Sequence, residues 1–399
     1  MSVSLLSGCG GEGGIPDRFP PETVRQFTAA QDEGKMTLTW INPDDADFSG
    51  VLIRRSTTDY PKNPTAQQTT NDKIVYNGAG TSFTDENLLN GATYYYTAFA
   101  YDDIPNYSYG VSASETGYYK PFTLIALPDT QYYSESYPTL FTTITQWIVD
   151  NKSEKNIVFV LHEGDITDDN TEDQWTNASS SMGVLDGVVP YALSIGNHDI
   201  GANRNTTLFN KYFPVSRYQN LPTFGGIYET DKLDNSFHFF SAGGTGWLVI
   251  SLEYNPRDEV MEWANQVAAD NPDRRIIVLT HAYLYGNERS SIGEDIWNKF
   301  VRLHSNIIFV FNGHYQTDSS GGRLVSTGDN GNKVYQMFSD YQWEYFGGLG
   351  YVRVVEIDTL ERKVTVKTYS TWMQTYKDDP DNQFEFDDVD MTPPLAAEE

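Results

Sequence analysis

Cysteine is almost absent from this chain of 399 residues, in which only Cys9 is present. A single cysteine excludes an intrachain disulfide and any cluster of thiolates that would bind zinc. Basic residues are also scarce, since 27 lysines and arginines stand against 55 aspartates and glutamates, for a net charge of −28. Because nucleic acids and anionic bilayers would repel such a chain, we expect no nucleic-acid-binding surface.

Two further features are missing. No apolar run approaches the length of a membrane-spanning helix, so we expect membrane attachment only through a lipid anchor. No glycine-rich phosphate-binding loop is present either, because the run Gly321-Gly-Arg323 has neither of the spacings that bind nucleotide phosphates.

The beginning of the sequence suggests export. Leu5-Leu-Ser-Gly-Cys9 resembles the end of a bacterial lipoprotein signal, in which the cysteine becomes lipid-modified. A chance leader rich in glycine and serine is the alternative. We interpret residues 1–21 as a truncated signal and tether, and expect an extracytoplasmic lipoprotein at the cell surface or in the periplasm.

The length predicts two domains. Residues 22–118 read as an all-β unit, because Met36–Trp40 and Val51–Arg55 alternate apolar and polar residues. The segment 91–101 resembles the fibronectin type III pattern, which implies a β-sandwich with Tyr94 as its corner tyrosine and Trp40 in its core. We expect this domain to act as a spacer.

From residue 119 to residue 390 the pattern changes to strands alternating with amphipathic helices, which predicts an α/β domain. One helix is indicated by apolar residues at helical spacing: Leu140, Phe141, Ile144, Trp147 and Ile148. Residues 391–399 form an acidic tail.

Five short polar clusters each follow an apolar run that predicts a buried strand. They are Asp129-Thr-Gln131, Gly164-Asp165-Ile-Thr-Asp168, Gly196-Asn197-His198-Asp199, Thr280-His281 and Gly313-His314-Tyr-Gln316. Ligands of α/β proteins bind at the C-terminal ends of strands, so these side chains are expected to converge. Their mixture of carboxylates, imidazoles and amides is what a metal site needs.

The order of these clusters resembles the calcineurin-like metallophosphoesterase superfamily. Its pattern is Asp-x-His, Gly-Asp-x-x-Asp, Gly-Asn-His-Asp/Glu, an isolated His and Gly-His-x-His, and three of the five clusters match fully. The resemblance implies an α/β/β/α sandwich that binds two divalent ions and hydrolyses phosphate esters of small molecules or lipid headgroups. Such an ion pair lowers the pKa of a bridging water, giving a hydroxide nucleophile, and neutralises the phosphoryl group.

The resemblance also implies the metal ligands, with Asp165 shared between both ions. The second ion would be held by Asp165, Asn197, His281 and His314, and the first by Asp129, Gln131, Asp165 and Gln316. The family usually has histidine where Gln131 and Gln316 stand. The first site is therefore richer in oxygen, which favours Mn²⁺, Mg²⁺, Ca²⁺ or Fe²⁺ over Zn²⁺, whereas the second could hold Mn²⁺, Fe or Zn²⁺.

His198 is expected beside the phosphate, where the family's histidine donates to a phosphoryl oxygen or protonates the leaving alkoxide. Asp199 would orient the His198 ring, and Asp168 would support the site from behind. Purple acid phosphatases carry an iron-ligating tyrosine at the position of Asp168, so no iron–tyrosinate site is expected. Candidate substrate contacts, any of which could instead be an ordinary loop residue, are Arg204, Arg289, Tyr283 and Tyr315.

A second hypothesis is a non-catalytic surface binding or adhesion protein with a degenerate phosphoesterase domain. The two glutamines favour it, and the retained aspartate, asparagine and histidine ligands oppose it. Of the remaining histidines, His162 could face the site or lie in the core, while His238 and His304 are expected to be structural.

Overall fold

The computed structural model describes residues 19–86, 88–104 and 106–392. The lipoprotein-like segment with Cys9, and all but the first two residues of the acidic tail, lie outside this part of the chain. The contacts divide the chain into two units, Met1–Tyr118 and Tyr119–Glu399. In the described residues, no helix has both the length and the apolar character needed to cross a membrane.

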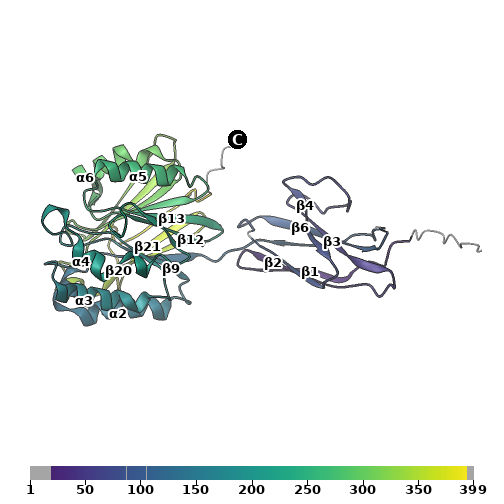
Figure 1. The fold of residues 1–399 in the computed structure, drawn as a ribbon, viewed down its shortest axis with the longest axis horizontal. Coiled ribbons are helices and arrows are strands. Elements are labelled where there is room, and N and C mark those ends of the chain that lie inside the picture. Colours follow the sequence, from purple (N-terminus) through teal and green to yellow (C-terminus); the bar gives the residue numbers. More distant parts are fainter. Residues whose placement is uncertain (1–18, 87, 105, 393–399) are drawn as a thin grey trace, which may run out of the picture. The chain divides into compact units, whose positions relative to one another are not determined.

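The first unit is a sandwich of two antiparallel sheets (Figure 1). One sheet has the order β1-β2-β5, with β1 at Arg25–Asp32, β2 at Lys35–Ile41 and β5 at Ser82–Asp85. The other has the order β4-β3-β6-β7, with β3 at Phe48–Ser56, β4 at Asp72–Gly78, β6 at Thr93–Asp102 and β7 at Val111–Thr116. The predicted all-β sandwich is therefore confirmed.

The core of this sandwich contains the two aromatic residues singled out in the sequence. Trp40 is 4% exposed and packs edge-on against Phe27 and Tyr76. Tyr94 is buried, and its hydroxyl accepts a hydrogen bond of 2.8 Å from the backbone N–H of Leu89. This bond ties strand β6 back to the chain that precedes it, as a corner tyrosine does.

The second unit has two seven-stranded sheets. The first sheet has the order β10-β9-β8-β20-β21-β22, with β23 also paired to β21. Its strands are β8 (Phe122–Leu127), β9 (Ile157–His162), β10 (Tyr191–Leu193), β20 (Tyr351–Asp358), β21 (Lys363–Ser370), β22 (Thr375–Lys377) and β23 (Gln383–Phe386). Strands β8, β9 and β10 are parallel, whereas β20 runs antiparallel to β8.

The second sheet has the order β11-β12-β13-β14-β17-β19-β18. Its strands are β11 (Phe224–Ile227), β12 (Ser236–Ala242), β13 (Thr245–Ser251), β14 (Arg275–Leu279), β17 (Ile307–Asn312), β18 (Gly321–Thr327) and β19 (Lys333–Ser339). Strands β13, β14, β17 and β19 are parallel. A separate two-stranded hairpin joins β15 (Leu284–Tyr285) to β16 (Glu288–Arg289).

Helices cover the outer faces of the two sheets (Figure 1). They are α1 (Gln131–Ser136), α2 (Pro138–Asn151), α3 (Glu172–Met182), α4 (Thr207–Tyr212), α5 (Asp258–Ala269), α6 (Ser291–Lys299) and α7 (Tyr345–Gly348). Helix α2 buries Leu140, Phe141, Ile144 and Ile148 against the first sheet, as their spacing predicts, and α5 and α6 pack on the second.

Besides the cores under the helices, a further hydrophobic core lies between the inner faces of the two sheets. Trp247 of the second sheet stacks between Phe240 and Phe309, and Phe122 of the first sheet packs against it edge-on. Two sheets packed face to face and covered by helices make four layers, so the expected α/β/β/α sandwich is confirmed.

Candidate metal centre

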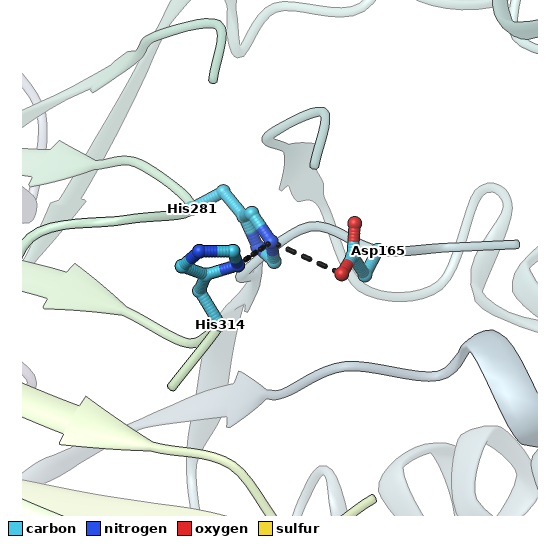
Figure 2. A group of neighbouring side chains, drawn as sticks. All are labelled: Asp165, His281 and His314. Carbon is cyan, nitrogen blue, oxygen red and sulfur yellow. Dashed lines mark hydrogen bonds and ion pairs between the residues drawn. The ribbon is translucent and has the colours of Figure 1, made fainter. Parts of the chain in front are cut away.

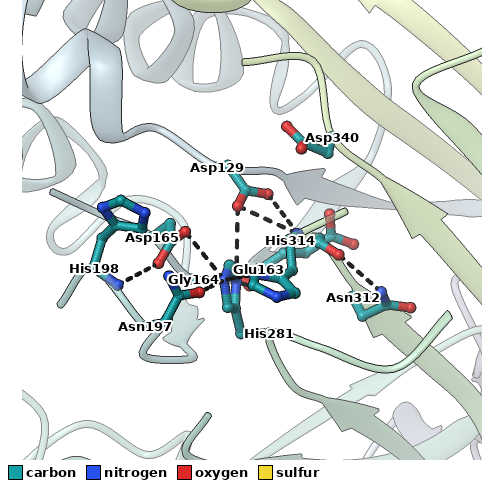
Figure 3. A network of polar contacts seen from close by, with 12 residues as sticks. Asp129, Glu163, Gly164, Asp165, Asn197, His198, His281, Asn312, His314 and Asp340 are labelled. Atoms are coloured by element: carbon teal, nitrogen blue, oxygen red, sulfur yellow. Dashed lines mark hydrogen bonds and ion pairs between the residues drawn. The ribbon is translucent and has the colours of Figure 1, made fainter. Parts of the chain in front are cut away.

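The polar clusters meet at one edge of the two sheets. Strands β8, β9, β10, β14 and β17 each end immediately before, or within a few residues of, one of them. Since these strands are parallel within each sheet, their C-terminal ends bring the clusters together. Figure 3 shows Asp129, Asp165, Asn197, His281 and His314 gathered there.

His281 is the centre of this group. Its Nδ1 lies 2.9 Å from the backbone carbonyl of Glu163, which can only accept, so Nδ1 carries the proton and Nε2 faces the site. Nε2 lies 3.1 Å from Asp165 Oδ2 and 3.0 Å from His314 Nδ1 (Figure 2), and 3.2 Å from Asn197 Oδ1 (Figure 3). Four ligand atoms thus converge on one point.

Asp165 is held by an unusual backbone. Its φ is 45°, and its Oδ1 accepts a hydrogen bond of 2.9 Å from the backbone N–H of His198. The neighbouring glycines are required by contact, because a Cβ on Gly164 would lie 2.6 Å from His281 Nδ1 and one on Gly196 would lie 2.0 Å from Asp165 Oδ1. Glycine at both positions therefore leaves room for the Asp165 carboxylate and the His281 imidazole to approach each other.

The electrostatics of the group call for a cation. Burial opposes charge on both residues, but the facing partner lowers the pKa of Asp165 and raises the pKa of His281. Without an ion, His281 Nε2 must carry a proton, because the Asp165 and Asn197 oxygens next to it are hydrogen-bond acceptors. A divalent ion bound by carboxylate, amide and two imidazoles would replace that proton, and this donor set suits Mn²⁺, Fe or Zn²⁺.

The proposed ligands of the first ion are partly gathered. Asp129 is buried and accepts from the backbone N–H of His314 at 3.2 and 3.3 Å. Gln131 begins α1 and donates from Nε2 to Asp168 Oδ1 at 2.8 Å, while its buried Oε1 has no hydrogen-bond partner. An orphaned buried oxygen on the residue two positions after Asp129 fits a metal ligand. Gln316, by contrast, is exposed on the loop after β17, and the described contacts do not place it with these groups.

Residues 122–317 match the calcineurin-like phosphoesterase family. This part of the chain is a calcineurin-like phosphoesterase domain. A Bacillus subtilis (strain 168) relative, the uncharacterized protein YvnB, is 37% identical over 262 residues, which are 63% of this chain and 20% of YvnB. The chain thus spans about a fifth of the length of that relative.

Two solved structures show similarity to parts of different extent of this chain. Purple acid phosphatase PPD1 from yellow lupin (Lupinus luteus) is 12% identical, with a TM-score of 0.47, and the match covers 94% of this chain and 75% of PPD1. An Fn3-like protein from Clostridium thermocellum is 19% identical, with a TM-score of 0.19, and covers 24% of this chain and 93% of its own.

Within the phosphoesterase domain, His198 lies at the rim of the ligand group. Its ring Nδ1 is 2.7 Å from the backbone carbonyl of Asp168 and 3.5 Å from Asp168 Oδ1. The carbonyl fixes the proton on Nδ1, so Nε2 is the free nitrogen, and the side chain is 40% exposed. This histidine can therefore reach a bound ester while its backbone supports Asp165.

The expectation that Asp199 orients the His198 ring is wrong. Asp199 is fully buried and accepts from the backbone N–H groups of Ile166, Thr167 and Gly196. It therefore fastens the loop after β9 to the loop after β10, and Asp168 is the residue that contacts the ring. Burial raises the pKa of Asp199 to about 7 in spite of these donors.

The candidate substrate contacts divide into two groups. Arg204 pairs with Glu253 at 3.0 Å and donates to the Tyr254 carbonyl, with 39% of its side chain exposed. Tyr315 packs its ring against His314, with centroids 4.4 Å apart. Both therefore remain near the centre.

Arg289 and Tyr283 have structural contacts instead, which was the alternative left open for both. Arg289 donates from Nε to Glu294 and from Nη1 to Ser326 and Gln336, and it stacks over Trp297. Tyr283 is 0% exposed in the core beneath α6. Proximity to His281 in the sequence did not place either side chain at the site.

The other histidines have structural roles. His162 is fully buried, bonds Thr130 through Nε2 and accepts from the Gly164 N–H, and burial lowers its pKa to about 3. His238 lies among aromatic rings, and His304 bonds Asn265. Through these hydrogen bonds, His162 supports the loop that carries Asp165.

Sequence reasoning missed two residues beside the centre. The Tyr254 ring lies 5.8 Å from the His281 ring and 5.4 Å from the His314 ring, between centroids. Asp340 is 0% exposed and interacts electrostatically with Asp129 (Figure 3). Each follows closely after a parallel strand, β13 or β19, so the rule that polar groups after strands line the site could have found both.

Proposed function

We propose that the phosphoesterase domain hydrolyses phosphomonoesters or phosphodiesters with two divalent ions that share Asp165. The observation that carries this proposal is the convergence of Asp165, Asn197, His281 and His314 on one point, with the His281 tautomer fixed by the Glu163 carbonyl. When bound, such ions neutralise the phosphoryl group and supply a nucleophile at neutral pH. They would also offset the repulsion between a phosphorylated substrate and a chain of charge −28.

The chain's own residues divide the remaining work. The backbone N–H of His198 and the imidazole of His281 hold the two oxygens of Asp165 in place. The His198 ring, oriented by the Asp168 carbonyl, presents Nε2 toward solvent, where it would protonate the leaving alkoxide or donate to a phosphoryl oxygen. The Asp168 carboxylate lies 3.5 Å from Nδ1 and so contacts the same side of the ring as the Asp168 carbonyl.

The substrate and the setting of the protein belong to this proposal as well. We propose a small phosphate ester or a lipid headgroup as substrate, an extracytoplasmic protein anchored through Cys9, and a spacer role for the N-terminal sandwich. The lipoprotein-like segment supports the location. Radiolabelled fatty-acid incorporation into the natural full-length protein, with Cys9→Ser as the control, tests the anchor.

Hydrolysis is tested with metal-stripped protein supplemented with Mn²⁺, Mg²⁺, Ca²⁺, Fe²⁺ or Zn²⁺. We expect turnover of p-nitrophenyl phosphate or bis-p-nitrophenyl phosphate with at least one ion. Asp165→Asn should lose bound metal and activity together, whereas Asp150→Asn, on the exposed face of α2, should keep both. Bound metal without turnover of either ester would instead favour a non-catalytic binding protein.

A further inference from the structure

Asp340 lies where a metal ligand would be useful. It follows β19 directly, and β19 is parallel to β17, whose end leads to His314. Asp340 therefore reaches the same sheet edge as the ligand loops, and Figure 3 labels it in the same group of polar residues as Asp129. Its side chain is fully buried, in contrast to the exposed Gln316.

The two buried carboxylates face one imidazole, His281, and no lysine or arginine of the described residues pairs with either of them. The Asp129 carboxylate lies close to the end of β19, because a Cβ on Gly313 would be 2.1 Å from Asp129 Oδ2 and 3.4 Å from the carbonyl of Ser339, the residue before Asp340. Among the ion pairs of the described residues, Asp129 has a 3.8 Å contact with His281, and Asp340 has none. Since buried charges in proteins are paired or bind metal ions, this pair of neighbouring aspartates calls for a positive partner.

The donor atoms around the pair are oxygens with free acceptor capacity. Asp340 accepts from the Gln342 backbone N–H at 3.0 Å, from Gln342 Nε2 at 3.3 Å and from the Trp343 side chain, which still leaves an acceptor position open on a carboxylate with about four lone-pair sites. Two residues that follow the pair closely in sequence each have a buried amide oxygen without a hydrogen-bond partner: Gln131 Oε1, two residues after Asp129, and Gln342 Oε1, two residues after Asp340. Unpartnered buried oxygens are rare and need an explanation.

We propose that Asp340 is a ligand of the first metal ion, in the place that the family's pattern would give to Gln316. The site then consists of oxygens alone, from Asp129, Gln131, Asp165 and Asp340. Oxygen ligands select hard ions such as Mn²⁺, Mg²⁺ or Ca²⁺, so the first site discriminates against Zn²⁺ more strongly than the second. This inference depends on the proposed two-ion centre.

The test counts bound ions and does not require turnover. Metal-stripped protein is equilibrated with Mn²⁺, the bound metal is measured by elemental analysis, and electron paramagnetic resonance reports whether two Mn²⁺ ions are magnetically coupled. We expect two coupled ions in the wild type and in Gln316→Ala. Asp340→Asn and Asp340→Ala should keep one ion and lose the coupling, with the first site weakened at least 10–100-fold, the loss typical of residues that merely support a ligand.

The outcomes separate this inference from the proposed function. Two coupled ions of unchanged affinity in both Asp340 variants would overturn the role of Asp340 and leave the proposed function standing. Loss of one ion in Gln316→Ala, or a single ion in the wild type, would also overturn it. A wild type that binds no ion would overturn the proposed function as well. Circular dichroism of each metal-free variant verifies that the fold is retained.

Discussion

His198 offers the sharpest test of mechanism, because its ring and its backbone have different partners. In His198→Ala the backbone N–H still donates to Asp165 Oδ1, so the carboxylate stays in place and the bound metal should be unchanged. The variant loses the ring and its hydrogen bond to the Asp168 carbonyl. One such bond on a partly exposed side chain contributes about 0.5–1.5 kcal/mol to stability, so the fold should persist.

The loss of activity should depend on the leaving group. Proton transfer by a positioned side chain contributes roughly 10²–10⁴-fold to a rate, which corresponds to about 3–5 kcal/mol of transition-state stabilisation. An alkoxide leaving group needs that proton, whereas p-nitrophenolate is stable without it. We therefore expect His198→Ala to lose roughly 10²–10⁴-fold in kcat on an alkyl ester, and much less on a p-nitrophenyl ester.

The assay measures kcat and KM for both esters, together with metal content by elemental analysis. His304→Ala removes a partly buried histidine that bonds Asn265 and should leave all these values near wild type. Equal losses on both esters would assign His198 to a phosphoryl oxygen instead of the leaving group. Loss of metal in His198→Ala would refute the assignment altogether.

Three further predictions concern metal, pH and stability. Gly196→Ala should lose metal binding, because its Cβ would lie 2.0 Å from Asp165 Oδ1. The control Gly183→Ala, whose Cβ would meet nothing closer than 3.6 Å, should keep it. The metal content of the two purified variants is measured by elemental analysis. Burial raises the pKa of Asp340 to about 7, above the 3.8 of a free carboxyl, so the metal-free protein loses stability as the pH rises from about 4 to 7 and the full cost is present above pH 7. Urea unfolding should find metal-free Asp340→Asn more stable than wild type at pH 8, by up to about 4 kcal/mol at 1.36 kcal/mol per pKa unit, and no more stable below pH 4, where the wild-type carboxyl is protonated in both states. Tyr94→Phe removes the acceptor of the Leu89 N–H and should destabilise the N-terminal unit by about 1 kcal/mol, seen as a lower unfolding midpoint of that unit, without changing metal content.

The fold could be predicted from sequence because each element carries its own signal. The helical spacing of residues 140–148 and the apolar strand runs report local periodicity, which the structure preserves. The position of a polar cluster after a strand likewise predicts convergence, because parallel strands share an edge.

The failures arise where side-chain direction decides the outcome. Tyr283 follows His281 by two residues, yet it turns under α6 into the core. Asp199 follows His198 directly, and its carboxylate turns instead toward backbone N–H groups of two loops. Asp340 lies outside the family's motif, although its place directly after β19 obeys the same rule as the motif residues.

The proposed ligands come from both halves of the sandwich. Asp129, Asp165 and Asn197 stand on loops of the first sheet, whereas His281 and His314 stand on loops of the second. A bound ion would therefore connect the two halves at this edge. By mass action it would stabilise the folded domain by RT ln(1 + [L]/Kd), or about 2.7 kcal/mol at a free-ion concentration a hundredfold above Kd. Removal of the metal by a chelator should weaken the contact between the two halves before either sheet unfolds. Protease cleavage of the metal-free protein would then begin in the loops that carry the ligands.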